Sequence, residues 1–300
     1  MLKLNFKNIQ KYLPKLINSV KQEKELNLSK CEFIDIMLIS AIDTLIKLYN
    51  PKIIPPTDQN VNMYLSVMNL TNYEKQPYLK NKNNYISIKQ FSHKNRTMVT
   101  KLSNEIIPQI SQFLNIKNEE FKKDFLSYFK YIFGEILNNV VDHSETKKTA
   151  CICCQAFNDK ICLAIADSGI GFKKSLEKNH YELLKLKSDA AINKALEPNI
   201  TGSEIINYGN TLTYKNAGMG LYVLNMIASH LKAKLVIISK EAIFINNQGK
   251  KHSKLLEVEF PGSIVYFEFQ ENKINFTFEE FMRIYVWKSD YDSGLDDVFD

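Results

Sequence analysis

The segment GEILNNVVDHSE, residues 134–145, gathers acid, amide and imidazole side chains in a stretch that otherwise has the apolar spacing of a buried helix. At about 100° per residue, Glu135, Asn139 and Asp142 fall within about 60° of one another on the helix circumference, and His143 flanks them. A solvated helix face usually carries Lys and Glu, and Asn is a poor helix former. This polar face is a candidate ligand site, although the stretch alone also fits an ordinary amphipathic helix.

Two glycine-bearing segments further along the chain could also contact a ligand. An apolar run ends at Asp167 and leads into Gly169 and Gly171, where a strand-end carboxylate could accept hydrogen bonds and the glycines would allow close backbone approach. Gly218 and Gly220 precede an amphipathic helix, whose unpaired N–H groups and dipole offer an anion site. Taken singly, the first segment also fits an Asp-Ser-Gly turn and the second a glycine-bearing loop.

Helices, strands and a long connection must position these residues. The polar face belongs to the longest helical pattern of the chain, residues 118–143, and an adjacent apolar stripe should pack on a sheet. The runs TACICCQAF and KICLAIAD flank residues 158–159 and predict a hairpin. Residues 172–217 are polar, with a helical stretch near SDAAINKALE, and such long connections are often lids. The apolar stripe consists of Phe125, Phe129, Ile132, Ile136 and Val140.

Further elements are expected on both sides of this region. Residues 99–117 suggest a helix interrupted near Pro108, and the runs KLVIIS, AIFIN, LLEVEF and IVYFEF predict strands. The first ~85 residues alternate short apolar runs with helical patterns, and this βαβα rhythm suggests a small α/β domain. Residues 76–98 are rich in Asn and Lys and contain one strand-like core, YISIKQF, so we expect a connection there.

The order and spacing of the three motifs resemble the GHKL superfamily of histidine-kinase-like ATPases, which includes the ATP-binding domains of histidine kinases, DNA gyrase and anti-sigma-factor kinases. That family shows a helix with E-x-x-x-N, a strand end with D-x-G-x-G, a variable lid, and G-x-G-L opening a helix. Residues 172–217 would be the lid. The matching positions are Glu135 and Asn139, then Asp167, Gly169 and Gly171, and finally Gly218, Gly220 and Leu221.

The resemblance covers about residues 100–270 and includes two further positions. His143 stands four residues after Asn139, as in the N-box of histidine-kinase-like members, whereas Asn138 lacks this spacing. The ending PGSIVYFEF resembles the closing strand of the family, with Ser263 at its threonine position. The resemblance implies a Bergerat-type α/β sandwich, in which a mixed sheet has helices on one face and ATP lies between the helices and the lid.

Roles for individual residues are implied by the same resemblance. Asn139 would coordinate the Mg²⁺ that bridges the triphosphate, and this suits a hard ion that takes few protein oxygens. Asp167 would accept a hydrogen bond from the adenine amino group, and Glu135 would act as the general base or orient water. The other positions would bind ATP, with Gly169 and Gly171 at the base, Gly218, Gly220 and Leu221 at the phosphates, Asp142 and His143 on the phosphate side, and Ser263 in the closing strand.

A second resemblance concerns the first domain. The segment LNLSKCEFIDIMLISAIDTLIKLY is similar to the D-L-S-x-x-x-F-I-D-S-S-G-L signature of STAS domains, the fold of anti-sigma-factor antagonists. Phosphorylated members carry Ser or Thr after the aspartate, whereas Ile36 follows Asp35 here, and Met37 and Leu38 stand in place of Ser-Gly. A STAS-like domain without its phosphoacceptor indicates a docking or sensing module and therefore a protein partner.

The expected organisation is that of an α/β (α+β) protein with two domains. Residues 1–85 would form the STAS-like domain, residues 86–99 a connection, residues 100–272 the ATPase domain and residues 273–300 a C-terminal extension. Within the extension, FEEFMRIYVW should pack as a terminal helix or strand, and an acidic tail, YDSGLDDVFD, follows it.

The composition is that of an ordinary globular protein. The chain has 300 residues, 45% hydrophobic and 24% charged. Its net charge of +6 comes mostly from scattered lysines, which fit a solvated surface better than a nucleic-acid partner. No apolar run reaches membrane-spanning length and the N-terminus lacks a signal-peptide pattern, so we expect a cytoplasmic protein without a membrane partner.

The five cysteines are expected to be buried thiols. Their odd number argues against a disulfide framework. Cys151, Cys153 and Cys154 lie in an apolar run, where the first two would share one strand face and the third would occupy the other. No second ligand pair at zinc spacing accompanies them, so buried thiols fit better than a metal site.

Two functions fit these features. An ATP-dependent enzyme would bind Mg-ATP and either hydrolyse it or transfer its γ-phosphate to a partner, as a kinase does. A nucleotide-responsive switch would instead close its lid on ATP and change its affinity for a partner, with little turnover. A structural protein with a degenerate pocket is disfavoured by the intact Glu135, Asn139 and Asp167. Related ATPase domains commonly dimerise, so a homodimer is a further possibility.

Overall fold

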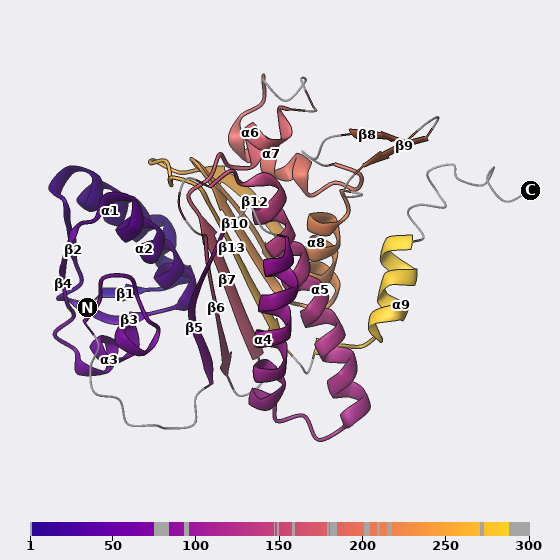
Figure 1. Ribbon diagram of the computed structural model, residues 1–300, viewed down its shortest axis with the longest axis horizontal. Coiled ribbons are helices and arrows are strands. Elements are labelled where there is room, and N and C mark those ends of the chain that lie inside the picture. Colours follow the sequence, from indigo (N-terminus) through magenta and orange to yellow (C-terminus); the bar gives the residue numbers. More distant parts are fainter. Residues whose placement is uncertain are drawn as a thin grey trace, which may run out of the picture.

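The protein is a mixed α/β structure built on one large sheet. Figure 1 shows this sheet in the computed structural model, with helices on one face and the N-terminal unit, residues 2–74, on the other. The acidic tail expected at the C-terminus lies outside the described residues. The structure describes residues 2–74, 84–92, 96–146, 148, 150–157, 160–178, 180, 185–200, 205–208, 211–214, 218–270 and 273–287.

Seven strands form the large sheet. In order across it they are β12 (Lys250–Leu255), β11 (Ala242–Asn247), β10 (Lys234–Ser239), β13 (Ser263–Gln270), β7 (Lys160–Asp167), β6 (Ala150–Phe157) and β5 (Tyr85–Phe91). Every described pair of neighbours is antiparallel, so the expectation of a mixed sheet was wrong. The reason is that β13 returns between β7 and β10, which run in the same direction but do not pair with each other.

The hairpin of β6 and β7 forms as predicted and sends its cysteines to opposite faces. Phe157 pairs with Lys160, on either side of residues 158–159, which lie outside the described part of the chain. Cys151 and Cys153 face the N-terminal unit, and Cys154 packs in the core beneath the helices. All five cysteines are buried and free, so the predicted alternation and the predicted buried thiols are confirmed.

Helices pack on the other face of the sheet: α4 (Thr97–Phe113), α5 (Glu119–His143), α7 (Ser188–Ala195) and α8 (Gly220–His230). Helix α5 begins where the Asn118 side chain accepts a hydrogen bond from Phe121 N, and its predicted apolar stripe is buried against the sheet. Helix α4 continues through Pro108, where an interruption was expected, because Ile106 and Ile110 are both buried in the core.

The N-terminal unit has the alternation of strands and helices that its sequence predicts. Two parallel pairs, β1 with β3 and β2 with β4, flank its helices. The elements are β1 (Leu2–Leu4), α1 (Ile9–Asn18), β2 (Glu25–Asn27), β3 (Cys31–Ile34), α2 (Ile36–Tyr49), β4 (Lys52–Ile54) and α3 (Gln59–Val67). Residues 36–46 of α2 are all buried, because this helix lies between the small strands and the large sheet, where it packs on β6 and β7.

Strand β5 belongs to the large sheet, although its sequence was expected to lie in a connection. It pairs with β6 at the sheet edge, and Ile86, Ile88 and Phe91 are buried. A buried polar contact also ties it to α2, because Gln90 Nε2 donates to Asp43 Oδ2 at 2.8 Å. The N-terminal unit and the sheet therefore share one continuous core on this face.

Strand β12 differs from its prediction, which placed a strand over LLEVEF. The chain turns back at once after β11, because Gln248 and Gly249 both have positive φ, 56° and 90°, and Asn247 pairs with Lys250. The strand thus covers Lys250–Leu255, an exposed and polar edge whose sequence carries no apolar alternation.

The C-terminal extension packs as a helix, as expected. Helix α9 (Phe278–Met282) and a further helical turn, Arg283–Trp287, follow β13. The hydroxyl of Tyr128 on α5 donates to the carbonyl oxygens of Phe276 and Thr277, at 3.2 and 3.0 Å, and holds the extension against α5. None of the described helices combines the length and the apolar character needed to cross a membrane.

Candidate functional site

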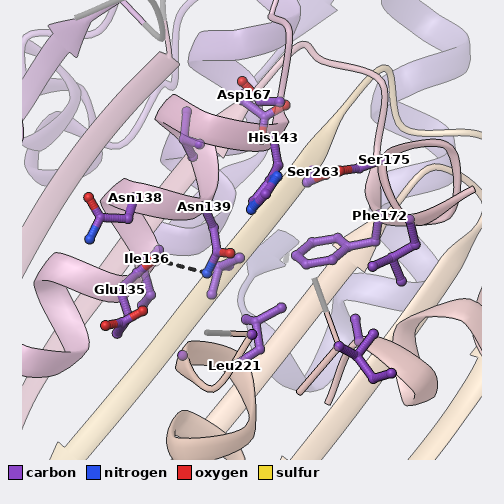
Figure 2. Close-up of a pocket in the computed structure, with 18 of the residues that line it drawn as sticks. Glu135, Ile136, Asn138, Asn139, His143, Asp167, Phe172, Ser175, Leu221 and Ser263 are labelled. Atoms are coloured by element: carbon purple, nitrogen blue, oxygen red, sulfur yellow. Dashed lines mark hydrogen bonds between the residues drawn. The ribbon is translucent and has the colours of Figure 1, made fainter. Parts of the chain in front are cut away.

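A pocket of about 280 Å³ lies between α5, the end of β7, the start of α8 and the short helix α6 (Phe172–Leu176). Figure 2 shows side chains from all four elements around it. Of the residues predicted for the site, only Asp142 and Gly169 do not line the pocket. Those that do are Glu135, Asn139, His143, Asp167, Gly171, Gly218, Gly220, Leu221 and Ser263.

Asn139 is fixed by its own helix. Its Nδ2 donates a hydrogen bond to the carbonyl oxygen of Glu135 at 2.9 Å, one turn earlier. This bond uses the donor side of the amide, and Oδ1 accepts no hydrogen bond from the described residues. In Figure 2, Asn139 and His143 point toward Phe172, whereas Asn138, which also lines the pocket, points the other way. Asn139 therefore presents an oxygen to a ligand at a fixed position.

Glu135 is a mostly buried carboxylate at the edge of the same pocket. Burial raises its pKa, and the negative charge of Asp142 raises it further. No described side chain donates a hydrogen bond to it. Gly220, the first residue of α8, lies so close that a Cβ at this position would overlap with Glu135 Oε2. Glycine at position 220 thus lets α8 begin directly against the carboxylate.

Asp167 ends β7 with its side chain buried, since only 4% of the residue is exposed. Burial raises the pKa of this carboxyl to about 7, and the backbone N–H of Gly169, the charge of Lys240 and the backbone N–H of Ser263 offset burial only in part. The Gly169 bond joins N to Oδ1 at 2.7 Å. A buried carboxyl that titrates near neutral pH can recognise a polar group of a ligand, and such groups are frequent in functional sites.

The two glycines after Asp167 have different roles. A Cβ at Gly169 would overlap with the carbonyl oxygen of Ser144, so this glycine lies behind the pocket, where the loop passes the end of α5. The next N–H, that of Ile170, donates to the same carbonyl at 2.7 Å. Gly171 does line the pocket, and its φ of +81° favours glycine.

Asp142 lies outside the pocket because an arginine holds it. Arg96 Nε and Nη2 donate to Asp142 Oδ1 and Oδ2 at 2.8 and 2.6 Å, a bidentate pair between the start of α4 and the last turn of α5. The sequence analysis missed Arg96, because a pair separated by 46 residues has no local signal. Asp142 acts on the site through its charge, which reaches Glu135.

The start of α8 presents backbone N–H groups to the pocket. The Val223 N–H donates to Met219 O at 2.9 Å, whereas the N–H groups of residues 220–222 have no hydrogen-bond acceptor among the described residues. The preceding N–H groups, from Gly220 to Tyr222, stand at the positive end of the helix dipole. An anionic group in the pocket would meet these donors.

The predicted lid contributes the remaining wall. Phe172, Ser175 and Leu176 of α6 line the pocket, and Figure 2 shows the Phe172 ring opposite Asn139. The helical stretch predicted near SDAAINKALE is α7 (Ser188–Ala195), and Ala195 also lines the pocket. A hairpin of β8 (Ile205–Tyr208) and β9 (Thr211–Tyr214) follows it.

Two aromatic residues of the pocket were missed from the sequence. Tyr131 stands four residues before Glu135, on the same face of α5, so helical spacing could have indicated it. Phe172 directly follows Gly171, but a single aromatic residue at the start of a long loop has no periodic pattern to mark it.

No model of a known protein family matches this chain, and no relative is found among curated proteins. In the part of the chain that the structure describes, no group of three or more His, Cys, Asp or Glu side chains is arranged to hold a metal ion. The chemistry of the pocket therefore has to be argued from the residues around it.

Proposed function

We propose that the pocket between α5 and α8 binds Mg-ATP and that residues 100–272 form a histidine-kinase-like ATPase domain. The main support is that motifs far apart in the sequence, around Glu135, Asp167 and Gly220, line one pocket. If the motif matches were due to chance, the three segments would not be expected to line the same pocket. Two features depart from the proposed family pattern: the sheet is wholly antiparallel, and Asp142 pairs with Arg96.

The residues present suit this ligand. Asn139 would offer its amide oxygen to a hard cation such as Mg²⁺, and phosphate and water oxygens would supply the other ligands. The N–H groups at the start of α8 are suited to bind the phosphates. The buried carboxylate of Asp167 is suited to accept a hydrogen bond from the adenine amino group. Bound Mg²⁺ would neutralise part of the phosphate charge.

Glu135 is the residue that we expect to support turnover. Its raised pKa suits a group that takes a proton from water or from the hydroxyl of a partner. The proposed reaction is accordingly hydrolysis of ATP or transfer of its γ-phosphate to a partner. The alternative is an ATP-responsive switch with little turnover, and it is favoured by the packing of α2 on β7, the strand that ends at Asp167.

The N-terminal unit, which resembles STAS domains in sequence, is the proposed docking or sensing module. Ile36 occupies the usual phosphoacceptor position and is only 2% exposed, at the start of the buried helix α2. Isoleucine has no hydroxyl group that could accept a phosphate. We therefore propose that the unit contacts a protein partner without being phosphorylated there.

Incubation of the full chain with γ-labelled ATP and Mg²⁺, with and without cell extract, tests the reaction. Label in free phosphate indicates hydrolysis, label on another protein indicates a kinase, and bound but unconverted ATP indicates the switch. Failure of the protein to retain ATP would contradict all three forms of the proposal.

Two matched variants assign the role of Glu135. We expect Glu135→Gln to bind ATP and to lose at least about 100-fold in turnover, as is typical when a general base is removed. Glu145→Gln makes the same chemical change at an exposed residue just beyond α5 and should leave turnover unchanged. Equal turnover in the two variants would remove Glu135 from the mechanism.

A further inference from the structure

A second cavity, of about 530 Å³, lies between the N-terminal unit and the face of the sheet opposite α5. Residues 32–36 of the STAS-like segment line it, although that resemblance does not predict a cavity there. One side, the sheet wall, includes Lys160, Lys234 and Glu268, and the other, the unit wall, includes Asn5 and Asp35. Small-molecule sites often form where two packed units meet, and the two walls of this cavity carry opposite charges.

The sheet wall has an excess of positive charge. Lys160 and Lys234 both contact Glu268, with Nζ–Oε distances of 3.3 and 3.0 Å. The Tyr266 hydroxyl also donates to Glu268 Oε2 at 2.8 Å. Burial acts to raise the pKa of Glu268, but the two lysines and these hydrogen bonds outweigh it and lower that pKa, so the carboxyl is ionised. Among the described lining residues, this wall thus carries two ammonium groups and one carboxylate, which is a net positive charge beside the cavity.

The unit wall is negative and contains an unsatisfied acceptor. Glu32 and Asp35 line it, with Lys7 as the one cation among its described lining residues. Asn5 Oδ1 is buried without a hydrogen-bond partner among the described residues. Buried polar atoms nearly always have a partner in native proteins, so this oxygen calls for an N–H or O–H group from a ligand or water.

Apolar and aromatic side chains lie between the charged groups. Phe33, Val61 and Tyr64 line the cavity from the unit, and 44% of Phe33 is exposed. Tyr64 is joined to the sheet by its hydroxyl, which donates to Gln155 Oε1 at 2.7 Å. The cavity therefore combines a positive end, a negative end and an apolar side.

We propose that this cavity binds a small zwitterion with an apolar body, either an apolar amino acid or a short apolar peptide with free ends. Its carboxylate contacts Lys160 and Lys234, and its ammonium group donates to Asn5 Oδ1 near the carboxylates of Glu32 and Asp35. Its apolar part covers Phe33 and the side chains beside it. This inference does not rest on ATP binding, because the two pockets share no lining residue.

Calorimetric titration of the full chain tests the proposal with four kinds of probe at millimolar concentration. Leucine and phenylalanine represent the amino acids, and Leu-Leu and Phe-Leu represent the peptides. N-acetylated and C-amidated forms of each probe remove one charge at a time. We expect at least one free zwitterion to bind, and both of its blocked forms to bind at least about tenfold more weakly. Binding by none of the free probes, or equal binding by blocked forms, would overturn the proposal.

Variants place the site. Lys160→Gln and Asn5→Ala should each weaken binding of the best probe by about tenfold, whereas Lys52→Gln, at an exposed lysine that lines neither pocket, should not change it. Circular dichroism and thermal melting show whether each variant is folded. If Lys160→Gln or Asn5→Ala fails to fold, Glu32→Gln, at an exposed lining residue, replaces it. Equal affinity in the wild type and in the folded cavity variants would overturn the assignment.

Discussion

Asp167 is a buried carboxylate and Glu268, on the neighbouring strand, is a partly buried one, and their surroundings differ. Both residues lie on the paired strands β7 and β13, at opposite ends of the shared register. Burial raises the pKa of Asp167 to about 7, because the nearby charge of Lys240 offsets it only in part. Two lysines and a tyrosine surround Glu268 and lower its pKa. The charge of Glu268 is thus balanced by neighbouring side chains, whereas the charge of Asp167 is balanced only in part.

The difference separates a structural charge from a candidate functional one. A buried carboxylate without a cation costs stability, and proteins mostly retain such groups where they serve a site. Asp167 also lies at a pocket lined by Asn139 and by the start of α8, whereas Glu268, which lines the second cavity, is held in an ion cluster with two lysines. Substitutions that remove the cations around Glu268 or the charge of Asp167 should reduce this difference between the two sites.

The largest expected effect comes from removing both partners of Glu268. In Lys160→Met/Lys234→Met this carboxylate is left buried without a cation, so we expect a loss of about 3 kcal/mol in the free energy of unfolding at pH 7. The contribution of Glu268 to stability also depends on pH. In the wild type, ionised Glu268 stabilises the fold at pH values above the ordinary glutamate pKa. This stabilisation is lost as the pH falls through the lowered pKa of the folded state.

The double variant should therefore lack that acid-induced loss, and its Glu268 should titrate above the ordinary value, as Asp167 does. Chemical denaturation from pH 3 to pH 8 measures both effects. A loss of stability under about 0.5 kcal/mol would show that the cluster is not what keeps Glu268 ionised.

At Asp167 a substitution is expected to stabilise the fold, and the pH dependence is the opposite of that at Glu268. Its folded-state pKa is raised, so its contribution is fully present below the ordinary aspartate value, 3.8, and is lost as pH rises through about 7. Asp167→Asn keeps the acceptor for Gly169 N and removes the charge. We expect this variant to be more stable than the wild type at pH 8 by about 2 kcal/mol, within a ceiling of about 4 kcal/mol set by the shift.

The same gain should vanish well below the ordinary value of 3.8, where the wild-type carboxyl is protonated in both states. Denaturant titrations of the two proteins at about pH 2.5 and at pH 8 give the comparison directly. A variant that is less stable at both values would mean that the Asp167 charge is well solvated in the native pocket.

The smallest effect is expected at Glu135, through its neighbours. Asp142→Asn should lower the pKa of Glu135 toward its ordinary value, because that charge is the second cause of the upward shift. Arg96→Gln removes the positive charge beside Asp142 and should raise the Glu135 pKa. The expected loss of stability is under about 1 kcal/mol, because 48% of the Arg96 side chain is exposed. Carbon-detected NMR titration of Glu135 follows both shifts, and shifts of the same sign would contradict this electrostatic link.

Local patterns in the sequence predicted much of the site and its supporting elements. The spacing of Glu135 and Asn139 placed both on one face of α5, and the apolar run before Asp167 placed it at a strand end. The alternation of Cys151, Cys153 and Cys154 also followed from strand geometry alone. The periodicity of a helix or strand determines which face a residue occupies, and the positions of these residues follow from that periodicity alone.

Features that depend on distant partners were not predicted. The antiparallel sheet arises because β13, the last strand, enters between β7 and β10, and no local pattern encodes that choice. Arg96 reaches Asp142 across two helices, and the cavity beside Asn5 exists only because the N-terminal unit packs on the sheet. The sequence around the edge strand β5 predicts a connection, because the segments that flank its short apolar alternation are polar.

Mg²⁺-dependent ATP binding by Asn139→Ala and Asn138→Ala tests the central claim most directly. The two variants make the same change at neighbouring residues of α5, but only Asn139 has its amide fixed by the Glu135 carbonyl. We predict that the wild type and Asn138→Ala bind ATP more tightly with Mg²⁺ than with EDTA. Asn139→Ala should lose at least about tenfold in affinity and most of the Mg²⁺ dependence. Equal Mg-ATP affinity in the wild type and Asn139→Ala would contradict the account.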